Sequence, residues 1–487
     1  MNATCSTTQA TSPGGNCVPT GEIDASCRAP LLVLFGNAAF WLLVASVFGL
    51  VASLKFHAPN LLSGCSWFTY GRVHAVATTA FLYGFAIEAG LGVGLWILAR
   101  SGQTQVAQPW FIAIGGRIWN LGVLLGVIGI LAGNSTGFDN LEMPHYSAVP
   151  LFIGYLLIGL WSVLTLHQRR ERSLQPSGWF LIAALFWFPW IFSTAQLMLV
   201  WCPVRGVTQA VIAWWFSTNL NSVWLALVGL AAIFHFIPKL MNKPLHSQYL
   251  ALFTFWTLIL FSSWGGIPAS APLPAWMPAL SAVATLLTGI TVLSVVVNVY
   301  KTAGRGCSQQ ENPPAGKFIA FGVMAFVVSG LMNVAGAIPQ ISTVTNFTWF
   351  TVAQSQLNSY GFFAMTMFGA IYYIVPLVTG IEWPSTKSVK AHFWLAAIGI
   401  ILVVVPLAIG GVVQGIKLNH PQIAFVDLTK ATLPFLRAST TGELLIAFGH
   451  LLFAMNFARL MFCLARTHLA PAYAAATVEL KPAEVKP

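Results

Sequence analysis

Charged side chains are what this sequence most lacks. Lys, Arg, Asp and Glu together make up 7% of the 487 residues, whereas hydrophobic residues make up 57%, and the mean hydropathy is +0.76. Soluble globular proteins carry about 25% charged residues. The composition therefore excludes an ordinary soluble protein and predicts an integral membrane protein.

Short stretches of alternating polar and apolar residues are also missing, which excludes a membrane β-barrel. The apolar residues instead form continuous runs, and a helix needs about 20 of them to cross the hydrocarbon layer. We predict an all-α integral membrane fold, a twelve-transmembrane-helix bundle within residues 30–467, between disordered cytoplasmic tails at 1–29 and 468–487. The predicted spans are about 31–54, 73–99, 110–133, 147–168, 177–201, 208–237, 248–268, 273–300, 315–338, 346–378, 389–415 and 435–465.

The sequence has few cysteines, seven in all, and none of them forms a CxxC pair. Cys5, Cys17 and Cys27 therefore give little support to a metal site in the N-terminal tail. We predict free thiols there, because the topology puts this tail in a reducing compartment.

The net charge of +11 does not require a nucleic-acid partner. The basic residues concentrate in alternate loops, such as 167–178 and 301–317, where they orient the protein and contact lipid. This asymmetry follows the positive-inside rule and predicts that both termini are cytoplasmic.

The segment from Trp349 to Pro376 is unusually polar for a membrane span. Amides are costly in hydrocarbon, so its polar side chains should face the bundle interior, a cofactor slot or a water cavity. These residues, in the outer third of the span, are Gln354, Ser355, Gln356, Asn358 and Ser359.

Two opposite charges lie at similar depths in the second and third spans, Glu88 and Arg117. An unpaired charge at that depth is expensive, so we predict a buried ion pair between them; a proton relay is the alternative. In the last span, His450 is predicted to pair with Glu443, one heptad earlier on a similar face, or to donate to a backbone carbonyl.

Five segments carry a resemblance to a known family: WWFSTNLNSVWLALVGLAAIFHFIPK (214–239), FWTLILFSSWGG (255–266), NFTWFTVAQSQLNSYGFFAMTMFGAIYYIVP (346–376), NSTGFDNLEMP (134–144) and ATLPFLRASTTGELLIAFGHLLFAMNFAR (431–459). They resemble subunit I of the haem-copper oxidase superfamily, specifically the C-family (cbb-type) cytochrome c oxidases, with the nitric oxide reductases close behind. The resemblance covers nearly the whole membrane region. It implies a multi-pass protein of a bacterial-type inner membrane.

The haem ligands of that family are mostly replaced here. In the family, a His at the position of His74 and the second His of a His-x-His pair hold the low-spin haem, and the first His of that pair holds the high-spin haem. The pair reads Gln354-Ser355-Gln356 in this chain. At most one b-type haem is expected, with His74 as one axial ligand and Gln356, Met365 or no side chain as the other.

The copper ligands are replaced as well. By the resemblance they would fall at Thr218 and within IPASAP (267–272), and the family's cross-linked Tyr would fall at Ser262. Amides and hydroxyls are poor substitutes for imidazole, so we expect neither copper nor a haem-copper centre. Arg437 matches a family arginine that could neutralise a haem propionate; an interfacial anchor is the alternative.

The sequence therefore favours a divergent subunit I homologue in a respiratory or electron-transfer complex. It would act as a scaffold, a quinol or haem subunit, or a partner for a c-type cytochrome. Two alternatives stay open: a functional cbb-type oxidase or nitric oxide reductase subunit whose ligands lie elsewhere, and a cofactor-free transporter or channel. Lipid and other respiratory subunits are the expected partners, and nucleic acid is not.

Overall fold

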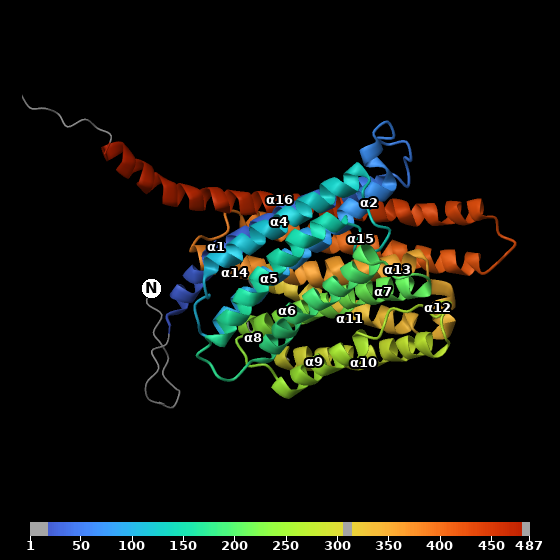
Figure 1. The fold of residues 1–487 in the computed structure, drawn as a ribbon, viewed down its shortest axis with the longest axis horizontal. Helices are drawn as coiled ribbons and strands as arrows, with labels where there is room; N and C mark the ends of the chain where they lie inside the picture. Colours follow the sequence, from blue (N-terminus) through green and yellow to red (C-terminus); the bar gives the residue numbers. More distant parts are fainter. Residues whose placement is uncertain (1–17, 305–313, 480–487) are drawn as a thin grey trace, which may run out of the picture.

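The computed structural model describes residues 18–304 and 314–479; for residues 468–479 it describes the backbone only. Within these ranges the chain is helical and has no strand (Figure 1). The α-helices are α1 (Thr20–Leu54), α2 (Tyr70–Thr79), α3 (Ile87–Ser101), α4 (Pro109–Ala132), α5 (His145–His167), α6 (Pro176–Ala195), α7 (Val207–Thr218), α8 (Leu225–Leu240), α9 (Gln248–Ser262), α10 (Trp276–Ala303), α11 (Pro314–Gly336), α12 (Pro339–Thr345), α13 (Trp349–Gln356), α14 (Met365–Thr379), α15 (Thr386–Leu418) and α16 (Phe425–Glu479).

Eleven helical stretches of the described chain are long and apolar enough to cross a membrane. They coincide with eleven of the twelve predicted spans. The remaining predicted span, 248–268, forms the 15-residue helix α9, which is about 22 Å long and so shorter than the hydrocarbon layer. The all-α membrane bundle is confirmed, whereas the count of twelve is not.

The first helix begins earlier than predicted. Residues 20–29, assigned to the disordered tail, form the first turns of α1, because Asp24 accepts a hydrogen bond from Trp96 (2.9 Å) and pairs with Arg100 (3.2 Å) on α3. Cys27 is a buried free thiol in this segment. At the other end α16 extends to Glu479. Residues 1–17, with Cys5 and Cys17, and residues 480–487 lie outside the described chain.

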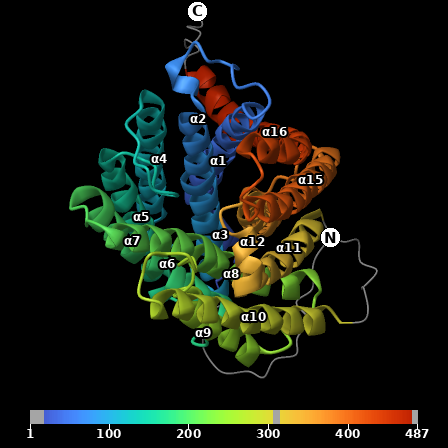
Figure 2. The same cartoon turned by 90° about the vertical axis from the view of Figure 1, so that its right-hand side faces the viewer.

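Three spans, called the central spans, are buried most deeply, and the labels of α3 and α8, which belong to two of them, lie near the middle of the bundle in Figure 2. The most apolar windows of Tyr70–Ser101, Val207–Leu240 and Trp349–Thr379 are 100%, 89% and 83% buried, against 33–50% for the other spans. The central spans are also those in which the sequence places His74, Thr218 and the Gln354–Gln356 pair. Each of them changes from α-helix to a short π-helical segment: η2 (Ala80–Ala86), η4 (Asn219–Trp224) and η5 (Leu357–Ala364).

These π-helical segments lie beside the sites of interest. η4 begins directly after Thr218, and η5 begins directly after Gln356. π-Helical turns are rare and occur frequently at functional sites. A fourth π-helical segment, η3 (Gln196–Trp201), follows α6 in a less buried span, so the π-helical geometry agrees with these positions but does not single them out.

The last two helices pack closely through small residues. A Cβ atom added to Gly442 of α16 would lie 2.6 Å from the carbonyl oxygen of Gly399 in α15, so glycine is needed for this close approach. The contact fixes the rotation of α16 and, with it, the direction of the adjacent Glu443.

Candidate functional site

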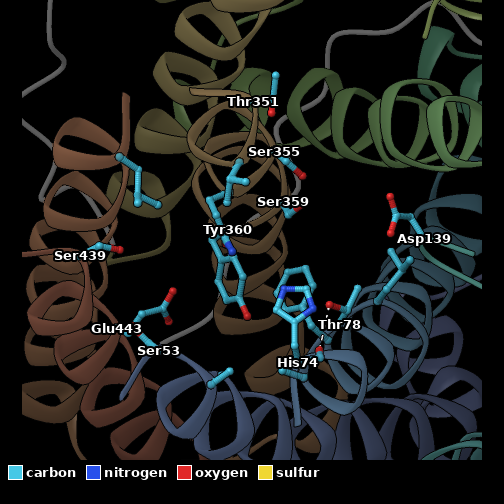
Figure 3. Close-up of a pocket in the computed structure, with 18 of the residues that line it drawn as sticks. Ser53, His74, Thr78, Asp139, Thr351, Ser355, Ser359, Tyr360, Ser439 and Glu443 are labelled. Carbon is cyan, nitrogen blue, oxygen red and sulfur yellow. Dashed lines mark hydrogen bonds between the residues drawn. The ribbon is translucent and has the colours of Figure 1, made fainter. Parts of the chain in front are cut away.

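A cavity of about 400 Å³ lies between α1, α2, α13, η5 and α16, covered on one side by the loop that joins α4 to α5 (Figure 3). It is called the His74 cavity below. Its size falls in the range of about 300–1,000 Å³ that is usual for small-molecule sites. Tyr70 and Asp139 on its wall are exposed, so the cavity opens at this end of the bundle. By the predicted topology this is the outer side.

His74 projects from α2 into this cavity with its side chain exposed. Its imidazole makes no hydrogen bond to any described residue, and its ring lies 5.6 Å from that of Tyr70, centroid to centroid. The imidazole is therefore available to a ligand.

Gln356 lines the same cavity as His74, but Gln354 does not. Residues two apart on a helix point about 200° away from each other. Gln354 accordingly faces two further cavities of about 180 and 50 Å³, and its amide lies 3.4 Å from the hydroxyl of Ser329. We call these two spaces the Gln354 cavities.

Several positions that the resemblance assigns to metal ligands or to the cross-linked Tyr line the Gln354 cavities. The larger is lined by Gly266 and by residues 267–269, the first part of the IPASAP segment, and the smaller by Ser262. Thr218 packs against Gly266: a Cβ there would lie 2.7 Å from Cβ of Thr218, and the φ of +93° also requires glycine. Thr218, Ser262, Gln354 and residues 266–269 thus lie near one another in the fold.

The chemistry of the Gln354 cavities is that of hydroxyls and amides. Their walls carry no imidazole, thiol or carboxylate. In the described chain as a whole, no three His, Cys, Asp or Glu side chains lie close enough together to hold a metal ion. Copper and iron prefer imidazole nitrogen, so this wall chemistry does not suit a copper-haem pair.

The His74 cavity fits a haem only in part. His74 could supply one axial nitrogen. No Lys or Arg lines the cavity, whereas Asp139, Glu142 and Glu443 do, so the two propionates of a haem would meet carboxylates instead of cations. The rings of Phe81 and Tyr360 stack at 4.1 Å within the wall. The cavity therefore offers one axial nitrogen for a haem but no cation for its propionates.

Arg437 is exposed on α16 and does not line the His74 cavity. It lies close to His57, whose pKa is lowered first by burial and then by this guanidinium. The predicted role of Arg437 beside a haem propionate gains no support from this position.

Glu142 approaches the cavity from the α4–α5 loop. It accepts hydrogen bonds from the amide N–H of Asn140 (3.1 Å) and the hydroxyl of Thr79 (3.5 Å). Burial raises its pKa to about 7 in spite of these bonds. The cavity can therefore change charge near neutral pH.

The predicted ion pair between Glu88 and Arg117 does not form. One oxygen of Glu88 receives the Asn37 amide at 3.5 Å, and the other has no partner among the described residues. Arg117 is exposed and lies over the ring of Trp110 at 5.6 Å. Its neighbour Gly116 faces α1, so Arg117 points away from the bundle.

The prediction for His450 is also wrong. Its ring nitrogen Nδ1 lies 2.7 Å from the hydroxyl of Ser46, so it bonds to neither Glu443 nor a backbone carbonyl. Glu443 instead points into the His74 cavity (Figure 3). Asp139 and Glu142 were not predicted at this site. The signal in the sequence was their rarity, because the whole chain has only 12 acidic residues. Together with Glu443, these two line the His74 cavity.

Comparison with known proteins agrees with this architecture. A family model described as "Cytochrome C and Quinol oxidase polypeptide I" matches residues 30–445. The match covers most of the chain and includes both the His74 cavity and the Gln354 cavities.

Individual relatives are distant but are matched over most of their length. The chain is 24% identical to the cytochrome c oxidase subunit 1 homolog of Azorhizobium caulinodans, over 88% of this chain and 81% of the relative. It is 24% identical to the Cbb3-type cytochrome c oxidase subunit CcoN1 of Stutzerimonas stutzeri, over 85% and 91%. It is 22% identical to a nitric oxide reductase subunit of the same species, over 76% and 80%.

Proposed function

Because this chain belongs to the cytochrome c and quinol oxidase polypeptide I family, we propose that it is a divergent subunit I homologue that does not itself reduce oxygen. It acts inside a larger respiratory or electron-transfer assembly, as a scaffold or as a partner of an electron-carrying subunit. Its relatives are named as subunits of oxidases and of a reductase.

One observation carries this proposal. Gln354, Ser262 and residues 266–269 line adjoining cavities, and Thr218 packs against Gly266. Ser262 and residues 266–269 are neighbours in the sequence, but Gln354 and Thr218 come from other helices, and a correct assignment requires them to lie beside this segment. Their convergence supports the assignment, and with it the loss of the nitrogen ligands that a haem-copper centre needs.

The same proposal limits the number of haem groups per chain and includes an orientation of the protein in the membrane. At most one b-type haem binds, with His74 as an axial ligand. Both termini lie in the cytoplasm of a bacterial-type inner membrane, with the His74 cavity on the outer side, where a c-type cytochrome could dock. The distribution of Lys and Arg supports this orientation.

Metal and haem analysis of the purified full chain tests the proposal. We expect no stoichiometric copper, no high-spin haem in the reduced-minus-oxidised spectrum, and at most one b-type haem per chain. One copper and one high-spin haem per chain would overturn it.

A gain-of-ligand variant tests the residue assignment. Gln354→His combined with Gln356→His should raise haem occupancy, because imidazole is the better iron ligand. The matched control is Gln196→His, which places an imidazole at another buried amide of the bundle. Equal haem content in the double variant, the control and the unaltered protein, all correctly folded, would refute the assignment.

A further inference from the structure

The wall of the His74 cavity combines carboxylates with aromatic rings. Asp139 and Glu142 come from the α4–α5 loop, and Glu443 comes from α16 on another side. No Lys or Arg lines the cavity. The aromatic residues on the wall are Phe56, Tyr70, Phe81, Trp349 and Tyr360.

Asp139 and Glu443 both lack a partner among the described residues, and Glu443 is the less exposed of the two. Its carboxylate makes no hydrogen bond or ion pair with the described residues. The hydroxyl of Ser53, drawn near it in Figure 3, is bonded instead to Thr440 at 2.6 Å. A carboxylate so deep in a membrane bundle is costly unless something compensates it, and the cavity is the space into which it points.

The basic residues on this side of the bundle do not compensate the carboxylates. Arg72 donates to the backbone oxygens of Ser66 (2.9 Å) and Leu131 (3.0 Å), and Lys55 donates to that of Leu61 (2.5 Å). Arg72 and Lys55 are thus directed to backbone carbonyls, and no Lys or Arg lines the cavity to neutralise its carboxylates.

The wall chemistry restricts the occupant. A bare metal ion is disfavoured, because no three His, Cys, Asp or Glu side chains in the described ranges converge on one point, and a volume of about 400 Å³ is far larger than one ion needs. A carboxylate beside aromatic faces is instead the usual way to hold a substituted ammonium group. A polyanion would be repelled.

We propose that the His74 cavity binds a small organic cation, an amine or a quaternary ammonium compound, with Glu443 as its counter-ion and the aromatic rings around it. The ligand enters at the end where Asp139 is exposed. This inference depends on the proposed function in one respect: it requires that no haem fills the cavity.

Choline titration into the purified full chain tests this inference. Its neutral isostere 3,3-dimethylbutan-1-ol is the matched probe, and sodium chloride keeps the ionic strength constant. We expect choline to raise the thermal midpoint and to give a binding isotherm by calorimetry, with the neutral isostere at least about tenfold weaker. Equal binding of the two compounds, or none by choline, would overturn the proposal.

Two variants connect the binding to the cavity. Glu443→Gln should weaken choline binding by about tenfold or more, and Asp139→Asn, in the exposed loop, by a smaller factor. Asp427→Asn is the control, because this exposed carboxylate is on the same helix but does not line the cavity. An unchanged affinity in folded Glu443→Gln protein would refute the proposed counter-ion.

Haem analysis of the same preparation separates the two proposals. One b-type haem per chain that disappears in His74→Ala would overturn the cation site and leave the proposed function intact. Stoichiometric copper with a high-spin haem would overturn both. Charge-dependent choline binding without haem supports both.

Discussion

At the end of the bundle that the sequence predicts to be cytoplasmic, called the inner end below, Asp24 has two partners on α3, whereas at the opposite, outer end Glu443 has none. Asp24 is 5% exposed, receives the indole N–H of Trp96 and pairs with Arg100. Lys239 lies over the same indole ring at 5.0 Å. The carboxylate of Asp24 is therefore compensated by groups of the chain itself, and we call these residues the inner cluster.

The difference shows that this sequence can pair a buried carboxylate when the pair is structural. It has nearly twice as many basic as acidic residues, 23 against 12, so cations are not in short supply. Glu88 also lacks a cation, but the wall of the His74 cavity leaves three carboxylates without one, and burying uncompensated charge opposes folding. Such a site is retained more readily if a bound ligand offsets the unfavourable free energy of the buried charge.

Breaking the inner cluster should have the largest effect on stability. Asp24→Asn keeps the shape of the side chain but leaves the guanidinium of Arg100 without its counter-ion. We expect a loss of about 3–5 kcal/mol in the free energy of unfolding, measured by denaturation in detergent micelles.

The control is Asp427→Asn. The contact of Asp427 with Lys430 is long, 4.0 Å, and both side chains are exposed, so its loss should cost no more than about 0.5 kcal/mol. Losses of similar size in the two variants would contradict the view that the inner cluster stabilises the fold.

The pH dependence of stability should come next in size. Glu142 holds its proton more tightly in the folded protein, with a pKa of about 7, than in the unfolded chain, where the value is 4.5. Stability should therefore fall as pH rises from about 4.5 to 7 and stay level above that, by up to about 3 kcal/mol in total. Unfolding curves across this range measure the decline.

Glu142→Gln should remove that part of the decline. Glu171→Gln is the control: hydrogen bonds from Ser173 lower the pKa of this exposed carboxyl, so its contribution has the opposite sign and the decline should persist. A decline of full size in Glu142→Gln would show that another group is responsible.

The sequence was sufficient for the course of the chain through the membrane. The length of an apolar run locates a span regardless of the helices against which it packs. Eleven predicted spans coincide with helices long enough to cross a membrane. It failed at α1, where Asp24 made the residues near Thr20 look like a polar tail. The partners that make this turn helical, Trp96 and Arg100, lie far away in the sequence and could not be read from local composition.

The site was only partly predictable, because the depth of a residue in the membrane does not tell in which direction its side chain points around the helix axis. His74 and Gln356 were expected to face each other and they do line one cavity. Glu88 and Arg117 also share a depth, yet they point in different directions. Glu443 was assigned to His450 by helical spacing, but close packing at Gly442 turns its side chain into the cavity.

Removing the outer charge should have a smaller effect, opposite in sign to that at the inner end. Glu443→Gln takes away a carboxylate that no described side chain neutralises, so the free energy of unfolding should rise by about 1 kcal/mol when no ligand is added. Denaturation of the Glu443→Gln and Asp24→Asn variants under the same conditions measures both changes in the free energy of unfolding. Destabilisation by more than about 1 kcal/mol would mean that Glu443 has a structural partner, and the contrast between the two ends would fail.

The smallest effect is expected for Arg117→Ala. An ion pair buried with Glu88 would cost about 3–5 kcal/mol to break, whereas an exposed cation over an aromatic ring contributes about 0.5–1 kcal/mol. The structure has the guanidinium over Trp110 at 5.6 Å, so we expect the lower figure. Trp110→Ala combined with Arg117→Ala forms a double-mutant cycle that isolates the contact. A loss of several kcal/mol in Arg117→Ala would instead indicate that Glu88 is compensated after all, and the uncompensated carboxylate of the His74 cavity would then be the exception in this bundle.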